Sequence, residues 1–499
     1  MLYQDFLPNY YSNIIKGQQQ STIIDNLYFY VADGITQDAV ANTNPKTIED
    51  EQIVLNQIIY GGRVTPSNLL GMIAKIEWTP GKVFAKFNDR DPSLSDKEFY
   101  CINSLGFVYK CIDNNNGSPS TQEPVSAIPG IFQLSDGYIW CYMYKLTESQ
   151  LLDYTVGNFI PLIEDPSAIN AAVRGTISTI EVETPGSFTM LTSGEVQQVL
   201  SNNTVRIEDS AHSSSGSYNQ MGLFVTHGPG QGEYYQISNY TANASGRYVT
   251  LDQPLVSAGL GSGYDIAPFI RISGNGENGS ARAVMIGNQI GGVQILDRGS
   301  NYTIADATLE GNTAFFASPS NLQVNLSPPK GHGAEPYSEL YVNYNLINID
   351  LDNYIISNNL PIDEISFCKI GLIRGILKEE EDVLFSESSF NNTFAADIPT
   401  ISGSFSVGDI IKRPNDNLTA RVIHVDSNKV IGIYRSPNQR FTLGDTVVNV
   451  NGSAEGNIID ITQPQIRMLV ADIVSITNID TTTRDENSRE VLQLLIKVK

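Results

Sequence analysis

One stretch decides the fold class of this chain: Gly137-Tyr138-Ile139-Trp140-Cys141-Tyr142-Met143-Tyr144. It follows Asp136, so that an Asp-Gly turn leads into a run in which every second residue is aromatic. Successive side chains of a strand point to opposite faces, and we therefore expect Tyr138, Trp140, Tyr142 and Tyr144 to share one face and pack together. The residues between them are apolar as well, which predicts a central strand covered on both faces.

The same two-residue period recurs elsewhere, for example at residues 83–87 and 107–112. With 41 Gly, 23 Pro and 24 Tyr beside only 7 Met, the composition favours many short strands joined by turns. Apolar residues at helical spacing occur only near the N-terminus, where residues 47–59 and the run from Thr65 to Ile76 each predict a short helix. The sequence therefore predicts a mainly β protein with a few short N-terminal helices.

Two changes of composition predict inserted domains. From about residue 170 the chain becomes rich in Gly, Ser and Asn. After Pro399, Ser406-Val407-Gly408-Asp409 is echoed by Thr442-Leu443-Gly444-Asp445, with two short strands between the copies, as in a small closed barrel. We expect a core domain over residues 1–170, 331–400 and 462–499, an inserted Gly-rich all-β domain over 171–330 and an inserted small β-barrel over 401–461.

Length, charge and hydropathy narrow the classes of partner. The 499 residues suffice for several domains with cores of their own. With 54 acidic against 31 basic side chains, the net charge of −23 would repel a phosphate backbone, so we expect no nucleic-acid partner. No apolar run approaches the roughly 20 residues that span a bilayer, and the N-terminus does not read as a secretory signal. We therefore expect no membrane partner and assembly in a cytoplasm.

One stretch has the spacing of a dinucleotide-binding fingerprint but lacks the helix that such a site requires. Residues 274–279 read G-x-G-x-x-G, follow a predicted strand and precede Asp297 by about twenty residues. A pyrophosphate needs a helix N-terminus after the third glycine, but residues 281–286 and 291–296 have the pattern of a β-hairpin. We interpret the motif as a glycine-rich turn and expect no cofactor.

Metal and thiol chemistry are not favoured either. Asp89, Asp91 and Ser93 resemble the start of a calcium loop, but Leu94 stands where the loop needs Gly. The histidines are far apart and form no H-E-x-x-H pair, and the cysteines form no C-x-x-C pair, so we expect no metal site and no disulfide framework. These residues are His212, His227, His332 and His424, and Cys101, Cys111, Cys141 and Cys368. Buried free thiols are the expectation for the cysteines.

Several stretches, among them residues 26–31, 107–113 and 135–142, have an order and spacing that resemble one known family, the smaller β-sandwich subunit of the baseplate wedge in T-even-type contractile-tailed phages. The resemblance covers about half of the chain in two flanking blocks and is strongest in the Asp-Gly-Tyr-x-Trp-x-Tyr stretch with the Ile160-Pro161 that follows. The matching stretches are residues 9–12, 26–31, 76–78, 107–113, 135–142, 159–161, 360–361, 365–373 and 470–498. The chain is longer than the family, and the excess lies in the two predicted inserts, which inherit nothing from the resemblance.

The resemblance implies a non-enzymatic structural protein with a multi-domain β-sandwich core, present in the virion at the tail baseplate. It implies a homodimer that links inner baseplate subunits to peripheral tail-pin or fibre proteins and takes part in the rearrangement that triggers sheath contraction. It assigns no catalytic, cofactor or metal residue. The residues that carry the structural signature are Trp78, Tyr109, Asp136, Gly137, Tyr138, Trp140, Tyr142 and Pro161.

Two other functions stay open from the sequence. The chain could be a tail-fibre or receptor-binding module, usually trimeric, whose Gly-rich insert presents Tyr234, Tyr235 and Tyr240 to a cell-surface carbohydrate. It could also be a polysaccharide-cleaving tail enzyme with a pair of carboxylates, which predicts that single Asp or Glu substitutions abolish turnover and leave the fold intact. Any β-sandwich core could also show such an aromatic strand without belonging to the wedge family.

Overall fold

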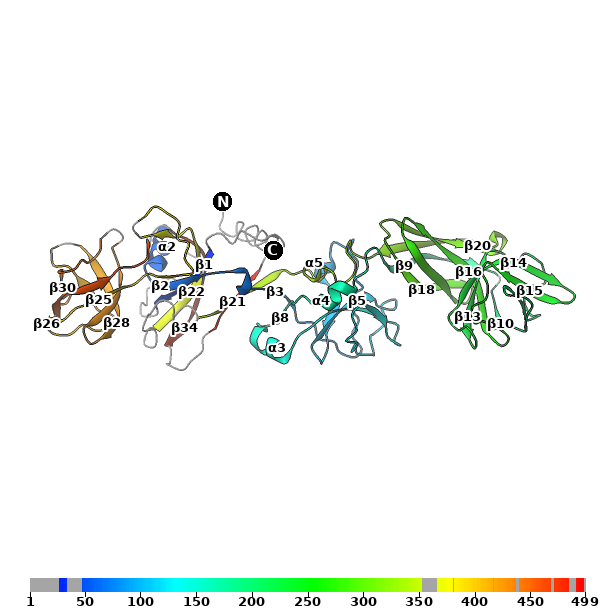
Figure 1. The fold of residues 1–499 in the computed structure, drawn as a ribbon, viewed down its shortest axis with the longest axis horizontal. Helices are drawn as coiled ribbons and strands as arrows, with labels where there is room; N and C mark the ends of the chain where they lie inside the picture. Colours follow the sequence, from blue (N-terminus) through cyan, green and yellow to red (C-terminus); the bar gives the residue numbers. More distant parts are fainter. Residues whose placement is uncertain are drawn as a thin grey trace. The chain divides into compact units, whose positions relative to one another are not determined.

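The computed structural model describes residues 27–33, 47–189, 191–351, 366–379, 381–415, 417–436, 439–467, 471–483 and 491–497 (Figure 1). The chain divides into two units, one formed by Met1–Met72 with Asn343–Lys499 and the other by Ile73–Val342. Strands dominate both units and helices are short, which confirms the predicted mainly β class. The predicted domain boundaries stay a prediction. The matching residues 9–12 and 360–361 lie outside the described residues.

Two antiparallel sheets form a β-sandwich in the first unit. One sheet has the order β24-β2-β1-β22-β34, and the other includes β35, β21 and β3 side by side. Their bounds are β24 Ser389–Asn391, β2 Ile58–Arg63, β1 Leu27–Asp33, β22 Ser366–Arg374, β34 Asp472–Thr483, β35 Val491–Lys497, β21 Tyr344–Asp350 and β3 Leu69–Ala74. Phe29 and Leu372 of the first sheet share one buried cluster with Ile347 and Leu492 of the second. The core therefore lies between the two layers, as the expected β-sandwich requires.

The opposite face of the first sheet is covered by α2 (Ile48–Leu55), whose Val54 and Leu55 pack with Tyr28 and Tyr30. This helix confirms the first of the two predicted helices. The second predicted helix is wrong, because only the single turn η1 (Pro66–Asn68) forms and the chain then continues as β3. Backbone pairing of β3 with β21 outweighs the helical spacing of its leucines.

The echoed Gly-Asp turns belong to an eight-stranded sheet of the same unit. Its order is β26 (Thr400–Ser402), β31 (Glu455–Asn457), β30 (Thr446–Asn449), β27 (Ile410–Lys412), β28 (Thr419–Asp426), β29 (Lys429–Tyr434), β25 (Phe394–Asp397) and β32 (Asp460–Thr462). Asp409 Oδ2 accepts from Ser406 N and Asp445 Oδ2 from Thr442 N, both at 2.8 Å. The two copies in the sequence are therefore two equal turns in space. β23 (Leu377–Lys378) and β33 (Ile466–Arg467) form a separate two-stranded sheet.

The second unit begins with a four-stranded sheet of order β4-β5-β7-β6, namely Tyr100–Ile102, Phe107–Asp113, Ile139–Lys145 and Ile131–Gln133. Buried clusters cover both of its faces. The other elements of this part are η2 (Leu94–Asp96), α3 (Glu148–Tyr154), β8 (Phe159–Pro161), α4 (Pro166–Ala171) and α5 (Pro336–Glu339). Thr147 begins α3 with a complete capping box, and Asp165 caps α4.

The predicted strand at residues 83–87 is wrong, because none forms there. Ala85 N donates to Glu98 O and Phe87 N to Cys111 O, both at 2.8 Å, so the segment divides its hydrogen bonds between two partners and follows neither as a strand.

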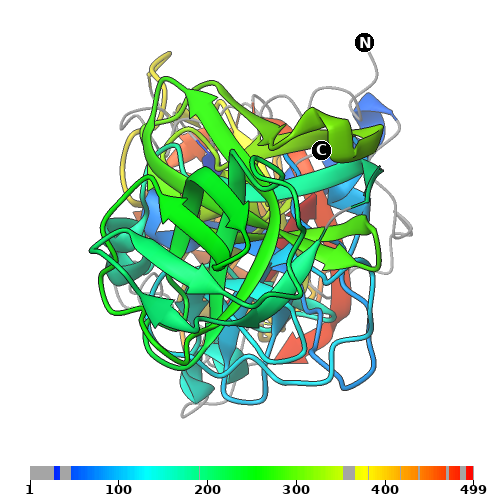
Figure 2. The same cartoon turned by 90° about the vertical axis from the view of Figure 1, so that its right-hand side faces the viewer.

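The Gly-rich region forms a ten-stranded sheet, whose strands face the viewer in green in Figure 2. Its main path is β11 (Gln198–Val199), β12 (Thr204–Ile207), β15 (Gly246–Leu251), β14 (Tyr234–Asn243), β13 (Met221–His227), β16 (Gly263–Gly274), β17 (Glu277–Ile286) and β18 (Gln289–Ser300). Two further strands, β10 (Thr192–Glu195) and β19 (Ala305–Glu310), pair with β16. A separate two-stranded sheet consists of β9 (Ile177–Phe188) and β20 (Phe316–Leu326), and the single turn η3 (Thr313–Phe315) comes directly before β20. The predicted all-β character of this region is confirmed.

Candidate functional site

Five of the eight signature residues meet in one aromatic cluster on one face of the β4-β5-β7-β6 sheet. Its members from the signature are Trp78, Tyr109, Tyr138, Trp140 and Tyr142. The Trp140 ring stacks on that of Tyr138 with centroids 5.6 Å apart and meets the Phe84 ring edge-on at 5.2 Å. Such pairs stabilise the fold beyond the area that they bury.

Asp136 and Gly137 form the turn beside this cluster. The Asp136 carboxylate accepts hydrogen bonds from Ser120 Oγ at 3.2 Å, from Thr121 N at 2.9 Å and from Tyr138 N at 3.1 Å. Gly137 has a φ of +87°, and a Cβ there would lie 2.6 Å from the Asn115 side chain. Only glycine fits this turn, and Asp136 therefore acts as a structural acceptor.

Hydrogen bonds hold three further polar side chains of the cluster, those of Trp78, Tyr138 and Tyr109. Trp78 Nε1 donates to Ser120 Oγ at 3.1 Å, which in turn donates to Asp136. The Tyr138 hydroxyl donates to Ser118 O at 2.6 Å and the Tyr109 hydroxyl to Ser126 O at 2.9 Å. Burial raises the pKa of both tyrosines above the ordinary value of 10.0, so they stay protonated near neutral pH. The signature thus builds a fixed core.

Tyr144 does not share the face of Tyr138, Trp140 and Tyr142, which corrects the sequence prediction. The pairing register shifts between Val108, opposite Tyr144, and Tyr109, opposite Tyr142. Met143 is thereby the extra residue of a β-bulge, and a bulge changes the face of every side chain that follows. Tyr144 packs in the cluster on the other face of the sheet.

Pro161, the eighth signature residue, lies in β8 and not in the aromatic cluster. The Tyr144 hydroxyl donates to Pro161 O at 3.1 Å, and the neighbours Ile160 and Leu162 join the same cluster as Tyr144. The signature therefore divides between the two faces of the sheet.

A buried polar cluster in this unit was not predicted from the sequence. Lys110 and Glu339 form an ion pair with both side chains shielded from solvent. Gly333 N and Glu335 N each donate to Glu339 Oε1 at 3.0 Å, and Lys110 Nζ lies 4.0 Å from the centre of the Phe87 ring. The sequence contains a signal for this cluster, because a lysine inside the apolar strand 107–112 needs a buried partner.

His332 lies beside this pair, and its Nε2 is 2.6 Å from Ser178 Oγ. Its Nδ1 is 4.0 Å from Glu339 Oε2, beyond hydrogen-bond distance. Burial, with the charges of Lys110 and Arg298, lowers the pKa of His332 well below its usual value of 6.5. The order serine, histidine, carboxylate is that of a hydrolase triad, but all three side chains are buried and the carboxylate is bonded elsewhere. The cluster holds together segments that are distant from each other in the sequence.

Comparisons with known proteins add little to this geometry. No family model matches the chain, and no curated protein is similar to it. One chain in a solved structure described as "Virion of native gene transfer agent (GTA) particle" is similar with 14% identity and a TM-score of 0.15, over 50% of this chain and 82% of that chain. At so low an identity and TM-score, this likeness to a virion component carries no argument about fold or function.

The glycine-rich motif at 274–279 spans the end of β16, a turn at residues 275–276 and the start of β17, and β17 and β18 form an antiparallel hairpin. The interpretation as a turn is confirmed. A Cβ at Gly276 would lie 2.3 Å from the Tyr302 ring, which explains the need for glycine there without a nucleotide.

Asp91, in the calcium-like stretch, is paired with Lys97 at 2.6 Å. The hydrogen bonds from Lys97 and Ser93 lower the pKa of Asp91 to about 2. In the described part of the chain, no group of three His, Cys, Asp or Glu residues could hold a metal ion. Cys101, Cys111 and Cys141 are buried free thiols, and Cys368 is half-buried. None of the described helices is long and apolar enough to cross a membrane.

The three tyrosines invoked for carbohydrate binding divide between the faces of the Gly-rich sheet. Tyr235 and Tyr240 are buried in its core, so the expectation that they are presented to a ligand is wrong. Tyr234 is half-buried on the opposite face and lines a pocket. Alternation along β14 explains the division of the adjacent pair.

Proposed function

We propose that this chain is a structural subunit of a phage tail baseplate wedge. In this proposal it forms a homodimer in the virion, links inner baseplate subunits to peripheral tail-pin or fibre proteins, and has interfaces that repack when the sheath contracts. The observation that carries the proposal is the convergence of five of the eight signature residues into one hydrogen-bonded aromatic core. That core makes the fold rigid and presents no catalytic group, and rigidity is what an assembly subunit requires.

Exposed apolar side chains on the eight-stranded sheet support a role in assembly. Val407 and Leu443 occupy equal positions in the two Gly-Asp turns and are 50% and 69% exposed. Ile401 and Ile459 on the same sheet are exposed as well. Exposed apolar side chains mark sites of protein–protein contact where they form a contiguous patch. We infer that these turns contact neighbouring wedge or fibre subunits.

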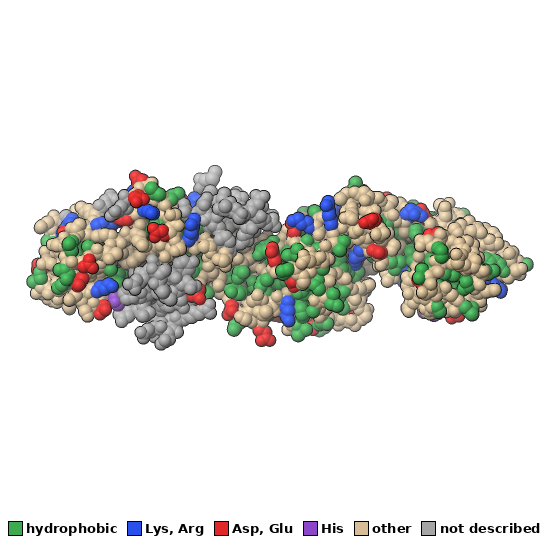
Figure 3. Space-filling model, in the orientation of Figure 1, with side chains coloured by type: hydrophobic (Ala, Val, Ile, Leu, Met, Phe, Trp, Pro, Cys, Tyr) green, Lys and Arg blue, Asp and Glu red, His purple; other side chains and the backbone are tan. Residues whose placement is uncertain are grey.

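The charge distribution supports protein partners over nucleic acid. On the face of the molecule in Figure 3, acidic and basic side chains of the described residues are interspersed, and no basic stripe runs along that face. A phosphate backbone is usually bound by a continuous basic patch.

The native mass of the purified full chain tests the homodimer. A species of about 109 kDa, twice 54.6 kDa, is expected. A trimer of about 164 kDa would contradict the proposal and favour the receptor-binding alternative, because fibre proteins are usually trimeric.

Leu443→Asp tests the contact surface in reconstituted wedges. It should weaken co-assembly with the other wedge proteins and leave the native mass of the free chain unchanged. Leu260→Asp, at an exposed position in the other unit, is the matched control. Unchanged co-assembly of Leu443→Asp would contradict the assigned surface. These substitutions are preferable to deleting residues 401–461, because Ile423, Ile431 and Ile433 belong to the sandwich core.

A further inference from the structure

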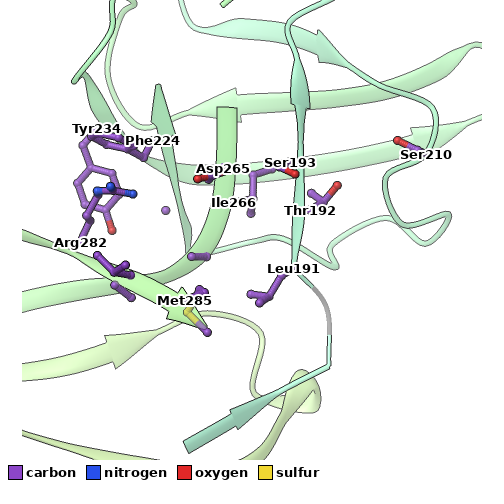
Figure 4. Close-up of a pocket in the computed structure, with 14 residues that line it drawn as sticks. Leu191, Thr192, Ser193, Ser210, Phe224, Tyr234, Asp265, Ile266, Arg282 and Met285 are labelled. Carbon is purple, nitrogen blue, oxygen red and sulfur yellow. The ribbon is translucent and has the colours of Figure 1, made fainter. Parts of the chain in front are cut away.

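The Gly-rich sheet has a pocket of about 530 Å³ on the face opposite its core (Figure 4). Four neighbouring strands contribute to it in register. Ser193 of β10 pairs with Asp265 of β16, Asp265 with Phe224 of β13, and Phe224 with Tyr234 of β14. Directly paired residues of a sheet point to the same face. One cross-strand row therefore carries a hydroxyl, a carboxylate and two aromatic rings into the pocket.

The aromatic side of the pocket is held in place by its neighbours. A Cβ at Gly222 would lie 2.4 Å from the Tyr234 hydroxyl, so this glycine lets the Tyr234 ring lie across the strand. The ring stacks on Phe269 at 5.1 Å with 12° between their planes. Fixed rings lose little entropy when they bind a ligand.

Arg282 adds a positive charge at the same side, as Figure 4 shows. Its guanidinium carbon lies 3.7 Å from the centre of the Phe224 ring. Its Nε donates to Gln294 Oε1 at 2.8 Å, which fixes the guanidinium plane. Asp265 of the row lies between this group and Ser193 in the view of Figure 4.

The chemistry of the pocket selects a class of ligand. A cation would meet Arg282, and an anion would meet Asp265 on a protein of net charge −23. A neutral molecule with many hydroxyl groups can donate to Asp265, accept from Arg282 and exchange hydrogen bonds with Ser193. Its C–H groups can pack against the edges of the Tyr234 and Phe224 rings, whose faces contact Phe269 and Arg282. The volume lies in the range of small-molecule sites.

We propose that this pocket binds a neutral pyranose unit of a polysaccharide. The proposal is independent of the wedge role, because it concerns one face of one sheet. It differs from presentation of Tyr235 and Tyr240, which are buried.

Saturation-transfer NMR on the purified full chain tests the proposal. The probes are the methyl α-pyranosides of glucose, mannose, galactose and N-acetylglucosamine at millimolar concentration. N-acetylneuraminic acid and choline are the anionic and cationic probes. We expect transfer to at least one neutral pyranoside and to neither charged probe. Transfer to no neutral pyranoside, or to a charged probe alone, would overturn the proposal.

Variants then locate the site. Asp265→Asn and Gly222→Val should each weaken binding of the neutral pyranoside by at least about tenfold, the first through loss of a charged acceptor and the second through displacement of Tyr234. Asp306→Asn, exposed on β19 of the same sheet, is the matched control and should bind as the wild type does. Thermal unfolding of each variant checks its fold. Wild-type affinity in a folded Asp265→Asn would show that the sugar binds elsewhere and would overturn the assignment.

Discussion

The Tyr142 hydroxyl donates to Asp165 Oδ2 at 2.7 Å, while Asp165 Oδ1 accepts from Ser167 N at 2.8 Å and so caps α4. One carboxylate thereby connects the aromatic strand to the first turn of a helix. Burial and the hydrogen bond to Asp165 raise the pKa of Tyr142 above 10.0. The signature tyrosine positions the segment that leads into the Gly-rich region.

Tyr142→Phe removes this hydrogen bond and keeps the ring. We expect the free energy of unfolding to fall by about 1 kcal/mol, because Asp165 keeps its bonds to Ser167 and regains water. Urea unfolding followed by tryptophan fluorescence measures it, since both tryptophans of the chain, Trp78 and Trp140, lie in this unit. Tyr154→Phe, at the end of α3, is the control. An equal loss in both variants would argue against a specific role of the Asp165 bond.

Lys110→Met leaves the Glu339 carboxylate buried without its cation. The free energy of unfolding should fall by about 3–5 kcal/mol. The double variant Lys110→Met with Glu339→Gln removes both charges, keeps an acceptor for Gly333 N and Glu335 N, and should recover much of that loss. The same fluorescence-detected unfolding measures the wild type, both single variants and the double variant. Additive losses in the double variant would show that the two residues do not act as a pair.

Stability should decrease as the pH falls below about 6.5, in part because of His332. The folded protein holds the pKa of His332 well below its value in the unfolded chain, so the unfolded state binds more protons at mildly acidic pH. The contribution of neutral His332 to the free energy of unfolding is fully present above about pH 6.5. Below that pH it is lost at up to about 1.4 kcal/mol per pH unit.

His332→Gln keeps a polar partner for Ser178 and cannot be protonated. Urea unfolding at pH 7.5 and 5.5 should therefore show a smaller loss in this variant than in the wild type. His227→Gln, exposed on β13, is the control and should keep the wild-type dependence. Parallel pH dependence of the wild type and His332→Gln would contradict a neutral buried His332.

Gly444→Ala tests the Gly-Asp turns. Gly444 has a φ of +89° with open space around the position of a Cβ, so the cost is backbone strain alone, about 1 kcal/mol. Gly403→Ala should cost more, because its Cβ would lie within 1.9 Å of Ser453 O. Hydrogen exchange of the amides of β30, measured by mass spectrometry, should speed up modestly in the first variant and strongly in the second. The reverse order would contradict the assigned turn geometry.

The sequence by itself determined the local features of the fold. The alternating residues of 137–144 and 281–296 specified strands, since successive side chains of an extended chain point to opposite faces. The two Gly-Asp copies specified equal turns, because a positive φ at glycine and a short acidic acceptor are local requirements.

The tertiary structure decided which of these local features meet and on which face. Tyr144 changes face through a bulge that depends on pairing with Val108, and residues 69–74 form a strand because β21 lies beside them. Lys110 finds Glu339 across 229 positions of sequence, and Ser193, Asp265, Phe224 and Tyr234 form one row only in the assembled sheet. Register and burial are set by contacts between distant segments, and a periodic pattern carries no information about which partner strand supplies them.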